Sequence, residues 1–129
     1  LAATGDRYVE RGIANDLDLN PDKLLSNLQA IQEQNFVERS TQLIADDDVY
    51  RFPNFSIEME TGTGKTYVYL RSVFELHKRY GLCKFIIVVP SVAVREGVLS
   101  SIAMMKDHFR SLYDNAPFDH YVYNSKDLS

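Results

Sequence analysis

Apolar residues recur at helical spacing in three parts of the chain. The first part runs from Pro21 to about Gln34, the second from Lys65 to Gly81, and the third from near residue 96 to about residue 112. The positions that define the spacing are Leu24, Leu28 and Ile31, then Tyr69, Val73, Leu76 and Tyr80, and finally Val98, Ile102, Met105, Phe109 and Leu112. Because an α-helix completes a turn in 3.6 residues, each set lies on one face, which predicts three amphipathic helices.

Three shorter stretches show the pattern of β-strands. Residues 55–59 alternate apolar and polar side chains, residues 85–89 form a continuous apolar run closed by Pro90, and residues 120–123 are a third candidate. A continuous β-branched run is typical of a strand covered on both faces, as in a parallel sheet. The order strand, loop, helix, strand, helix, strand therefore predicts an α/β fold, a parallel sheet with flanking helices and right-handed crossovers.

The other segments set the boundaries of this predicted domain. Residues 1–20 are polar and without a clear period, so we interpret them as an N-terminal arm, and residues 21–129 as the domain. Residues 36–54 connect the first helix to the first strand and contain Asp46-Asp47-Asp48. This acidic run is interpreted as a solvated loop. A metal site is the weaker alternative, because three adjacent carboxylates cannot all face one ion.

Composition narrows the broad class of protein. The chain has 129 residues, 45 % hydrophobic and 25 % charged, which is typical of one globular domain. Its net charge of −4 gives no general attraction to nucleic acid, so any DNA contact must come from a local patch. The single cysteine, Cys83, excludes a disulfide framework. With no membrane-spanning run or signal peptide visible, we expect no membrane association and a cytoplasmic location.

The strongest chemical signal lies between the first predicted strand and the second predicted helix. It is the run Glu60-Thr61-Gly62-Thr63-Gly64-Lys65-Thr66, which is typical of a phosphate-binding loop. Gly62 and Gly64 allow a tight turn whose backbone N–H groups can face an anion. Lys65 adds a positive charge near the β- and γ-phosphates, and the Thr66 hydroxyl can ligate the Mg²⁺ that accompanies ATP. A Gly- and Thr-rich turn with a chance lysine is the structural alternative.

Two longer segments carry a more specific signal. The first is Phe55-Ser56-Ile57-Glu58-Met59-Glu60-Thr61-Gly62-Thr63-Gly64-Lys65-Thr66-Tyr67, and the second is Lys84-Phe85-Ile86-Ile87-Val88-Val89-Pro90-Ser91-Val92-Ala93-Val94-Arg95-Glu96-Gly97-Val98. A third stretch, Leu24 to Asn35, precedes both. Together they resemble the leading helix and motifs I and Ia of the restriction (Res) subunits of type III restriction-modification enzymes. The resemblance covers roughly residues 20–129.

The resemblance implies a partial RecA-like P-loop domain of a superfamily 2 helicase-type motor, which binds ATP and Mg²⁺. In such motors motif Ia contacts the DNA strand, which implies that Ser91, Arg95 and Gly97 bind the DNA backbone. A strand-to-helix turn in which Arg95 pairs with a nearby carboxylate is the structural alternative. Met59 stands where the general loop pattern expects a glycine, which favours helicase-like ATPases over small-molecule kinases.

A glutamine upstream of the loop contacts adenine in related motors. Gln32 is the candidate in this chain, with Gln29 and Gln34 as alternative registers. The structural alternative is a solvated position on the helix. Tyr67 follows the loop at helical spacing and is expected in the core, with contact to the nucleotide as the alternative.

The resemblance also implies partners, namely double-stranded DNA, a methyltransferase (Mod) subunit and the remainder of the same polypeptide. The acidic motif II and the second motor domain, which hydrolysis requires in this family, do not occur in the 129 residues. The chain is therefore expected to be the first part of a motor domain and inactive by itself. The alternatives are a non-catalytic nucleotide-binding or assembly module, another superfamily 2 DNA helicase, and a small-molecule P-loop kinase.

Overall fold

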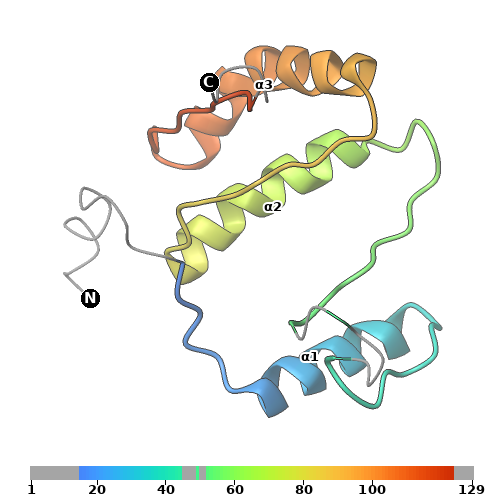
Figure 1. Cartoon of the computed structure of the whole chain (residues 1–129). Coiled ribbons are helices and arrows are strands. Elements are labelled where there is room, and N and C mark those ends of the chain that lie inside the picture. The colour runs from blue at the N-terminus through green and yellow to red at the C-terminus, as the bar shows by residue number, and fades with distance from the viewer. Residues whose placement is uncertain (1–14, 45–48, 50–51, 124–129) are drawn as a thin grey trace.

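A computed structural model describes residues 15–44, 49 and 52–123, and within these residues the chain forms three α-helices (Figure 1). Helix α1 spans Pro21–Gln34, α2 spans Lys65–Tyr80 and α3 spans Val92–Leu112. All three predicted helices are thus confirmed. Helix α3 begins about one turn earlier than predicted, because Ser91 caps it.

The helix ends follow from the local sequence. The Asn20 side chain accepts a hydrogen bond of 2.8 Å from the backbone N–H of Asp22, and Pro21 occupies the first turn of α1. Helix α2 ends at Gly81, whose φ of 71° is left-handed and whose N–H bonds to the carbonyl oxygen of His77. At the start of α3 the Ser91 hydroxyl accepts a bond of 3.3 Å from the Val94 N–H.

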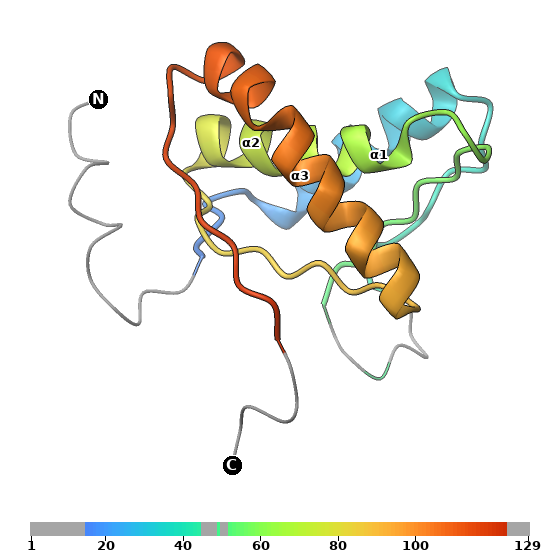
Figure 2. The same cartoon turned by 90° about the horizontal axis from the view of Figure 1, so that it is seen from above.

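The core lies between α2 and α3, which cross each other (Figure 2). Leu70 and Phe74 of α2 pack against Phe109 and Tyr113, at the C-terminal end of α3. The Phe74 ring stacks on Phe109 and Tyr113, with centroids 4.8 and 5.1 Å apart, and meets Phe118 edge-on at 5.3 Å. Phe109 is only 2 % exposed. The apolar faces of two predicted helices therefore cover each other.

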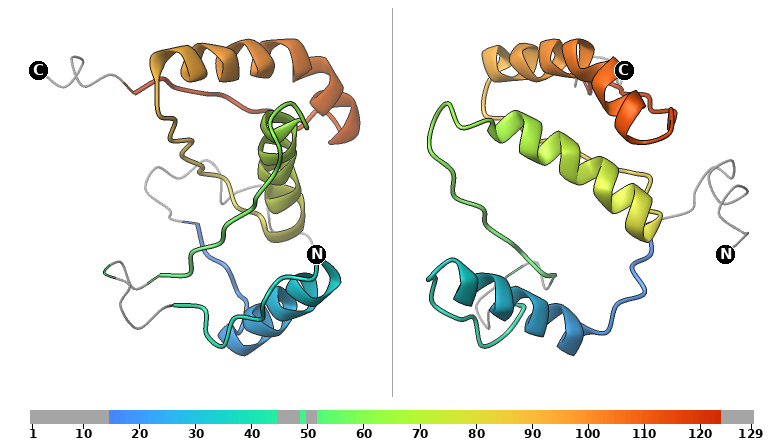
Figure 3. Two further views of the ribbon diagram at one scale, coloured as in Figure 1. Left: turned by 90° about the vertical axis from the view of Figure 1, so that its right-hand side faces the viewer. Right: turned by 180° about the vertical axis from the view of Figure 1, so that it is seen from behind.

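Helix α1 lies apart from this pair, below it in Figure 1 and in both views of Figure 3. It has no buried residue, and its Ile31 remains 58 % exposed. The hydrogen bonds of its side chains are local. The side chains of Gln29 and Gln32 bind Ser40, in the segment that turns back along the helix.

The predicted parallel sheet is wrong for the described part of the chain, which contains three helices and no strand. Residues 55–59, 85–89 and 120–123 have no strand hydrogen bonding, and Ile57, Ile86 and Val88 are 76 %, 91 % and 88 % exposed. Alternation and β-branching favour an extended backbone locally, but a strand exists only when its N–H and C=O groups bond to a neighbour. No such neighbour lies beside these segments in the described residues.

One contact joins the segment before α1 to the segment after α2. The Asn15 side-chain oxygen accepts hydrogen bonds from the N–H groups of Cys83 and Lys84 at 2.9 and 3.1 Å. Its Nδ2 donates to the carbonyl oxygen of Lys84 at 2.5 Å. The last residues of the predicted N-terminal arm, 15–20, are therefore anchored, whereas 1–14 lie outside the described residues, as does the acidic run 46–48.

Candidate nucleotide-binding site

The Gly-rich loop forms a tight turn immediately before α2. The N–H and the hydroxyl of Thr63 both donate to the carbonyl oxygen of Glu60, at 3.4 and 2.6 Å. Gly62 and Gly64 have φ angles of 81° and 88°, in the left-handed region that favours glycine. An added Cβ would meet no atom within 4 Å at either position. The two glycines are therefore required by backbone conformation and not by crowding.

Lys65 and Thr66 are the first two residues of α2, directly after this turn. Gly64 is the N-terminal cap of the helix and supplies no side-chain hydrogen bond to its first turn. The N–H groups at a helix start carry partial positive charge and suit a bound anion. Lys65 is exposed and Thr66 is half-buried, so the ammonium and the hydroxyl both lie at the surface of this turn.

An open depression of about 290 Å³ lies beside the loop and is lined by Glu58, Met59 and Glu60. Its two glutamates give it a negative charge. The groups of the loop that could hold a phosphate are the backbone amides and Lys65, and the Thr66 hydroxyl could ligate a cation bound to that phosphate. Thr61 lies in the same turn and is exposed.

The structure does not bring Gln32 next to the loop. Its amide oxygen accepts from the N–H of Ser40, and its Nε2 donates to the Ser40 hydroxyl, each at 2.9 Å. Gln29 donates to the carbonyl oxygen of Ser40 at 2.8 Å and accepts from Arg39 at 3.1 Å. Both glutamines therefore hold the turn after α1, and the predicted adenine contact stays a prediction.

The predicted DNA-contacting residues lie in the first two turns of α3. Ser91 caps the helix, and its hydroxyl oxygen accepts from the Val94 N–H. Arg95 donates from Nε and Nη2 to Oε1 of Glu96, at 3.2 and 3.0 Å. This is the kind of pairing that the structural alternative predicts. An exposed ion pair of this type contributes about 0–1 kcal/mol, so it does not commit Arg95 to Glu96. An added Cβ at Gly97 would have open space around it.

A row of polar contacts between α2 and α3 was not predicted from the sequence. We call it the polar ladder, and its members are Tyr67, Arg71, Glu75 and Arg79 on α2, with His108 and Tyr113 on or next to α3. The four α2 residues follow one another at intervals of four. This spacing places side chains on one helix face and is the signal that could have identified the row.

The hydrogen bonds of the polar ladder form two groups along α2. The Tyr67 hydroxyl lies 3.1 Å from Nε2 of His108 and accepts a bond of 3.4 Å from Nη1 of Arg71. Further along, the Tyr113 hydroxyl donates to Oε1 of Glu75 at 2.7 Å, and Arg79 donates to Oε2 of Glu75 at 3.0 Å. These contacts extend from the first turn of α2 to its last.

Three groups in the polar ladder have shifted pKa values. The Tyr113 hydroxyl, and secondly Arg79, lower the pKa of Glu75 below its ordinary 4.5. Burial, and secondly the bond to Glu75, raises the pKa of Tyr113 above 10.0. Hydrogen bonding to Tyr113 and to Tyr67 raises the pKa of Arg71. At a pH between the pKa of Glu75 and the pKa of Tyr113, the phenol is neutral and the carboxylate is ionised. The hydrogen bond from Tyr113 to Glu75 is then fully formed.

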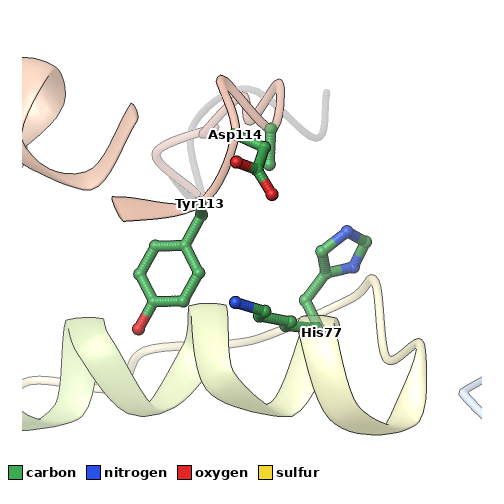
Figure 4. A pocket seen from close by; sticks show the side chains of 5 residues that line it. His77, Tyr113 and Asp114 are labelled. Carbon is green, nitrogen blue, oxygen red and sulfur yellow. The ribbon is translucent and has the colours of Figure 1, made fainter. Parts of the chain in front are cut away.

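A second depression, of about 160 Å³, lies at the opposite end of α2 (Figure 4). It is lined by His77, Lys78, Tyr113, Asp114 and Ala116. The Nζ atom of Lys78 lies 5.8 Å from the centroid of the Tyr113 ring. Since His77 comes 12 residues after Lys65 in α2, about 18 Å of helix separates this depression from the Gly-rich loop. It is therefore not part of the candidate nucleotide site.

The described residues hold neither a candidate metal centre nor a candidate membrane span. No group of three or more His, Cys, Asp or Glu side chains gathers there as a metal-binding cluster. Nor does any of the three described helices combine the length and apolarity that crossing a membrane requires.

Comparison with known proteins gives a consistent family. Residues 22–127 match the family model described as type III restriction enzyme, res subunit. The chain is 45 % identical over 77 residues to the StyLTI Res subunit of Salmonella typhimurium strain LT2. It is 34 % identical over 101 residues to the EcoPI Res subunit of Escherichia phage P1, and 33 % identical over 111 residues to the EcoP15I Res subunit of Escherichia coli.

These alignments cover 58 %, 77 % and 84 % of the chain, but only 8 %, 10 % and 11 % of the respective relatives. The chain therefore spans about a tenth of the length of the curated relatives that it matches. No solved structure matches it. The family model nevertheless covers most of the 129 residues, and the resemblance stated from the two motif segments is confirmed. The chain belongs to the family of type III restriction enzyme Res subunits.

Proposed function

We propose that the chain binds ATP with Mg²⁺ through the loop Glu60–Thr66, as part of an ATP-driven, helicase-type motor. The observation that carries the proposal is the left-handed turn at Gly62 and Gly64, followed at once by Lys65 at the start of α2. A turn, a helix N-terminus and a lysine in this order combine three sources of positive potential at one place. The family match supports the same assignment.

In this proposal each group has a separate role. The loop amides and the N-terminus of α2 hold the phosphates, and Lys65 neutralises charge that develops on the γ-phosphate during transfer. Thr66 contributes one hydroxyl ligand to Mg²⁺. Glu60 shapes the turn through its carbonyl oxygen, which accepts both bonds from Thr63. Phosphoryl transfer needs positioning and charge neutralisation more than covalent catalysis by the protein. In this proposal the loop supplies the positioning and part of the charge neutralisation.

The test of the nucleotide site is Lys65→Ala in the full-length natural protein. We expect loss of ATP hydrolysis and weaker binding of ADP in the presence of Mg²⁺, with an unchanged unfolding temperature, because Lys65 is exposed. Lys106→Ala, an exposed lysine on α3, is the matched control and should behave as wild type. Steady-state ATPase assays and isothermal titration calorimetry measure the two effects. Wild-type turnover in the Lys65 variant would refute the assignment.

We further propose that the first turns of α3 contact the DNA backbone through Ser91, Arg95 and Gly97. A hydroxyl, a guanidinium and an uncrowded glycine at a helix N-terminus suit a phosphodiester, which carries charge but no sequence information. The exposed partner Glu96 can be exchanged for a phosphate at little cost. The relatives are subunits of restriction-modification enzymes, so double-stranded DNA and a modification subunit are the partners that we propose for the whole protein.

Arg95→Ala tests the DNA contact. We expect weaker binding to all DNA sequences alike and a salt dependence lower by roughly one phosphate contact, with ATP affinity unchanged. Arg110→Ala, at the other end of α3, is the matched control. Fluorescence anisotropy at several salt concentrations measures the slope. An unchanged affinity and slope would make Arg95 a structural residue paired to Glu96.

A further inference from the structure

We propose that Tyr67 and His108 are positioning residues, whose contact fixes the first turn of α2 against α3 and thereby sets the orientation of Lys65 and Thr66. This inference rests on the proposed nucleotide site and adds to it a second layer of residues that touch neither phosphate nor metal. Tyr67 follows Thr66 directly in the first turn of α2, so a shift of Tyr67 also moves Lys65 and Thr66.

The loop has few contacts of its own. Its internal bonds join Thr63 to Glu60, and the space around Gly62 and Gly64 is open. Lys65 is exposed and Thr66 only half-buried. The position of the loop relative to the rest of the molecule must therefore be set from the helix side.

Tyr67 is the first residue after the loop that joins the core. Its ring stacks on Phe109, the most buried residue of the cluster, with centroids 5.7 Å apart and an angle of 20° between the planes. Its hydroxyl lies 3.1 Å from Nε2 of His108, and the two rings are 5.7 Å apart. The stacking sets the distance of the first turn from α3, whereas the directional polar contact sets its rotation about the helix axis.

Two polar groups meet the Tyr67 hydroxyl. Arg71 donates to it through Nη1 at 3.4 Å. Nε2 of His108 lies 3.1 Å from the same oxygen, and the imidazole tautomer decides which of the two donates. Tyr67→Phe removes the hydroxyl and keeps the stack of residue 67 on Phe109, so this variant separates orientation from packing. Removing the His108 imidazole breaks the same contact and also a ring contact with Phe109 at 5.5 Å.

The experiment compares Tyr67→Phe, His108→Ala and His108→Gln in the full-length natural protein. We expect kcat for ATP to fall about 10-fold in the first two variants, because misplaced phosphate-facing groups mainly lose transition-state contacts. The Kd for ADP should rise less than about 3-fold, since the loop amides still bind the ground state. His108→Gln presents an amide near the position of Nε2 and should recover most of the lost kcat. Because both residues act through one contact, the double variant Tyr67→Phe with His108→Ala should be no worse than either single variant.

The control for stability is Phe118→Leu, which alters the far side of the aromatic core, where Phe118 meets Phe74 edge-on. It should lower the unfolding temperature without changing kcat per bound nucleotide. If the Tyr67 and His108 variants behave in the same way, their role is structural and the inference is overturned. Nucleotide binding that does not depend on Lys65 would overturn the proposed function, and this inference with it. Binding that depends on Lys65, together with wild-type kcat in Tyr67→Phe and His108→Ala, would overturn the inference alone.

Discussion

Helix α1 and the pair formed by α2 and α3 have similar amphipathic sequences but different surroundings. The pair buries Leu70 and Phe74 against Phe109 and Tyr113, whereas α1 buries no residue at all. Helix α1 is held by its Asn20 cap and by glutamine bonds to the following turn, all of them local in sequence. The difference teaches that helical spacing identifies a helix reliably but does not say whether its apolar face is covered.

The same difference applies to the extended segments. Residues 85–89 carry the most apolar pattern in the chain, yet Ile86 and Val88 are nearly fully exposed. A helix satisfies its own backbone hydrogen bonds, whereas an extended segment depends on a neighbour for each of them. An apolar pattern therefore forms a helix by local hydrogen bonds alone, but it forms a strand only where a partner segment lies beside it.

The largest expected effect separates the two helical regions. Phe109→Ala should lower the free energy of unfolding by about 3–5 kcal/mol, because it leaves a cavity in the aromatic core. Ile31→Ala on α1 removes a side chain that is 58 % exposed. This variant should change the free energy of unfolding by less than about 0.5 kcal/mol. Urea denaturation followed by circular dichroism measures both values. Equal losses would mean that α1 has a buried face in solution.

A second comparison concerns two valines. Val98 is 7 % exposed on α3, and Val98→Ala should cost about 1.5 kcal/mol for the lost methyl groups. Val88 is 88 % exposed in the extended segment, so Val88→Ala should leave the same denaturation midpoint unchanged. A loss at Val88 comparable to that at Val98 would show that residues 85–89 are covered.

The cap of α3 should have a smaller effect. Ser91→Ala removes the acceptor for the Val94 N–H and should cost about 1 kcal/mol. Ser100→Ala, at an exposed position within the same helix, is the matched control and should be neutral or slightly stabilising. Thermal unfolding of the two variants side by side is sufficient. A neutral Ser91 variant would place the true start of α3 nearer to Gly97, as the sequence alone predicted.

The smallest effect is a change in pH dependence. The folded pKa of Glu75 lies below 4.5, so its contribution to stability is present above 4.5 and is lost as the pH falls through the lower folded value. The charged groups around it are Arg71 and Arg79. Glu75→Gln should therefore reduce the loss of unfolding temperature that occurs as the pH falls below 4.5, with Glu33→Gln on α1 as the control. Identical acid profiles for wild type and Glu75→Gln would contradict the assigned contact.

Sequence reasoning was successful where the determinants are local. The three helices, and the end of the second one at Gly81, depend on residues within one turn of each other, and all were confirmed. The parallel sheet was wrong because strand pairing is decided by segments far apart in the chain. The loop residues were identified from their order, but the Tyr67–His108 contact was missed. It depends on how α2 crosses α3, and the single sequence does not encode that angle in any short pattern.

Hydrogen bonds of the Asn15 side chain close a long loop of the chain. They join Asn15 to Lys84, 69 positions apart, and the segment between the two residues contains α1, the Gly-rich loop and α2. Closing a flexible ring of that size costs roughly 4 kcal/mol in chain entropy, while three exposed hydrogen bonds contribute about 1.5–4.5 kcal/mol in total. The three bonds of Asn15 thus offset part of the entropy cost of holding residues 15 and 84 together. Cys83, the chain's one thiol and an exposed one, lies within this link, where a fluorescent label would report on it.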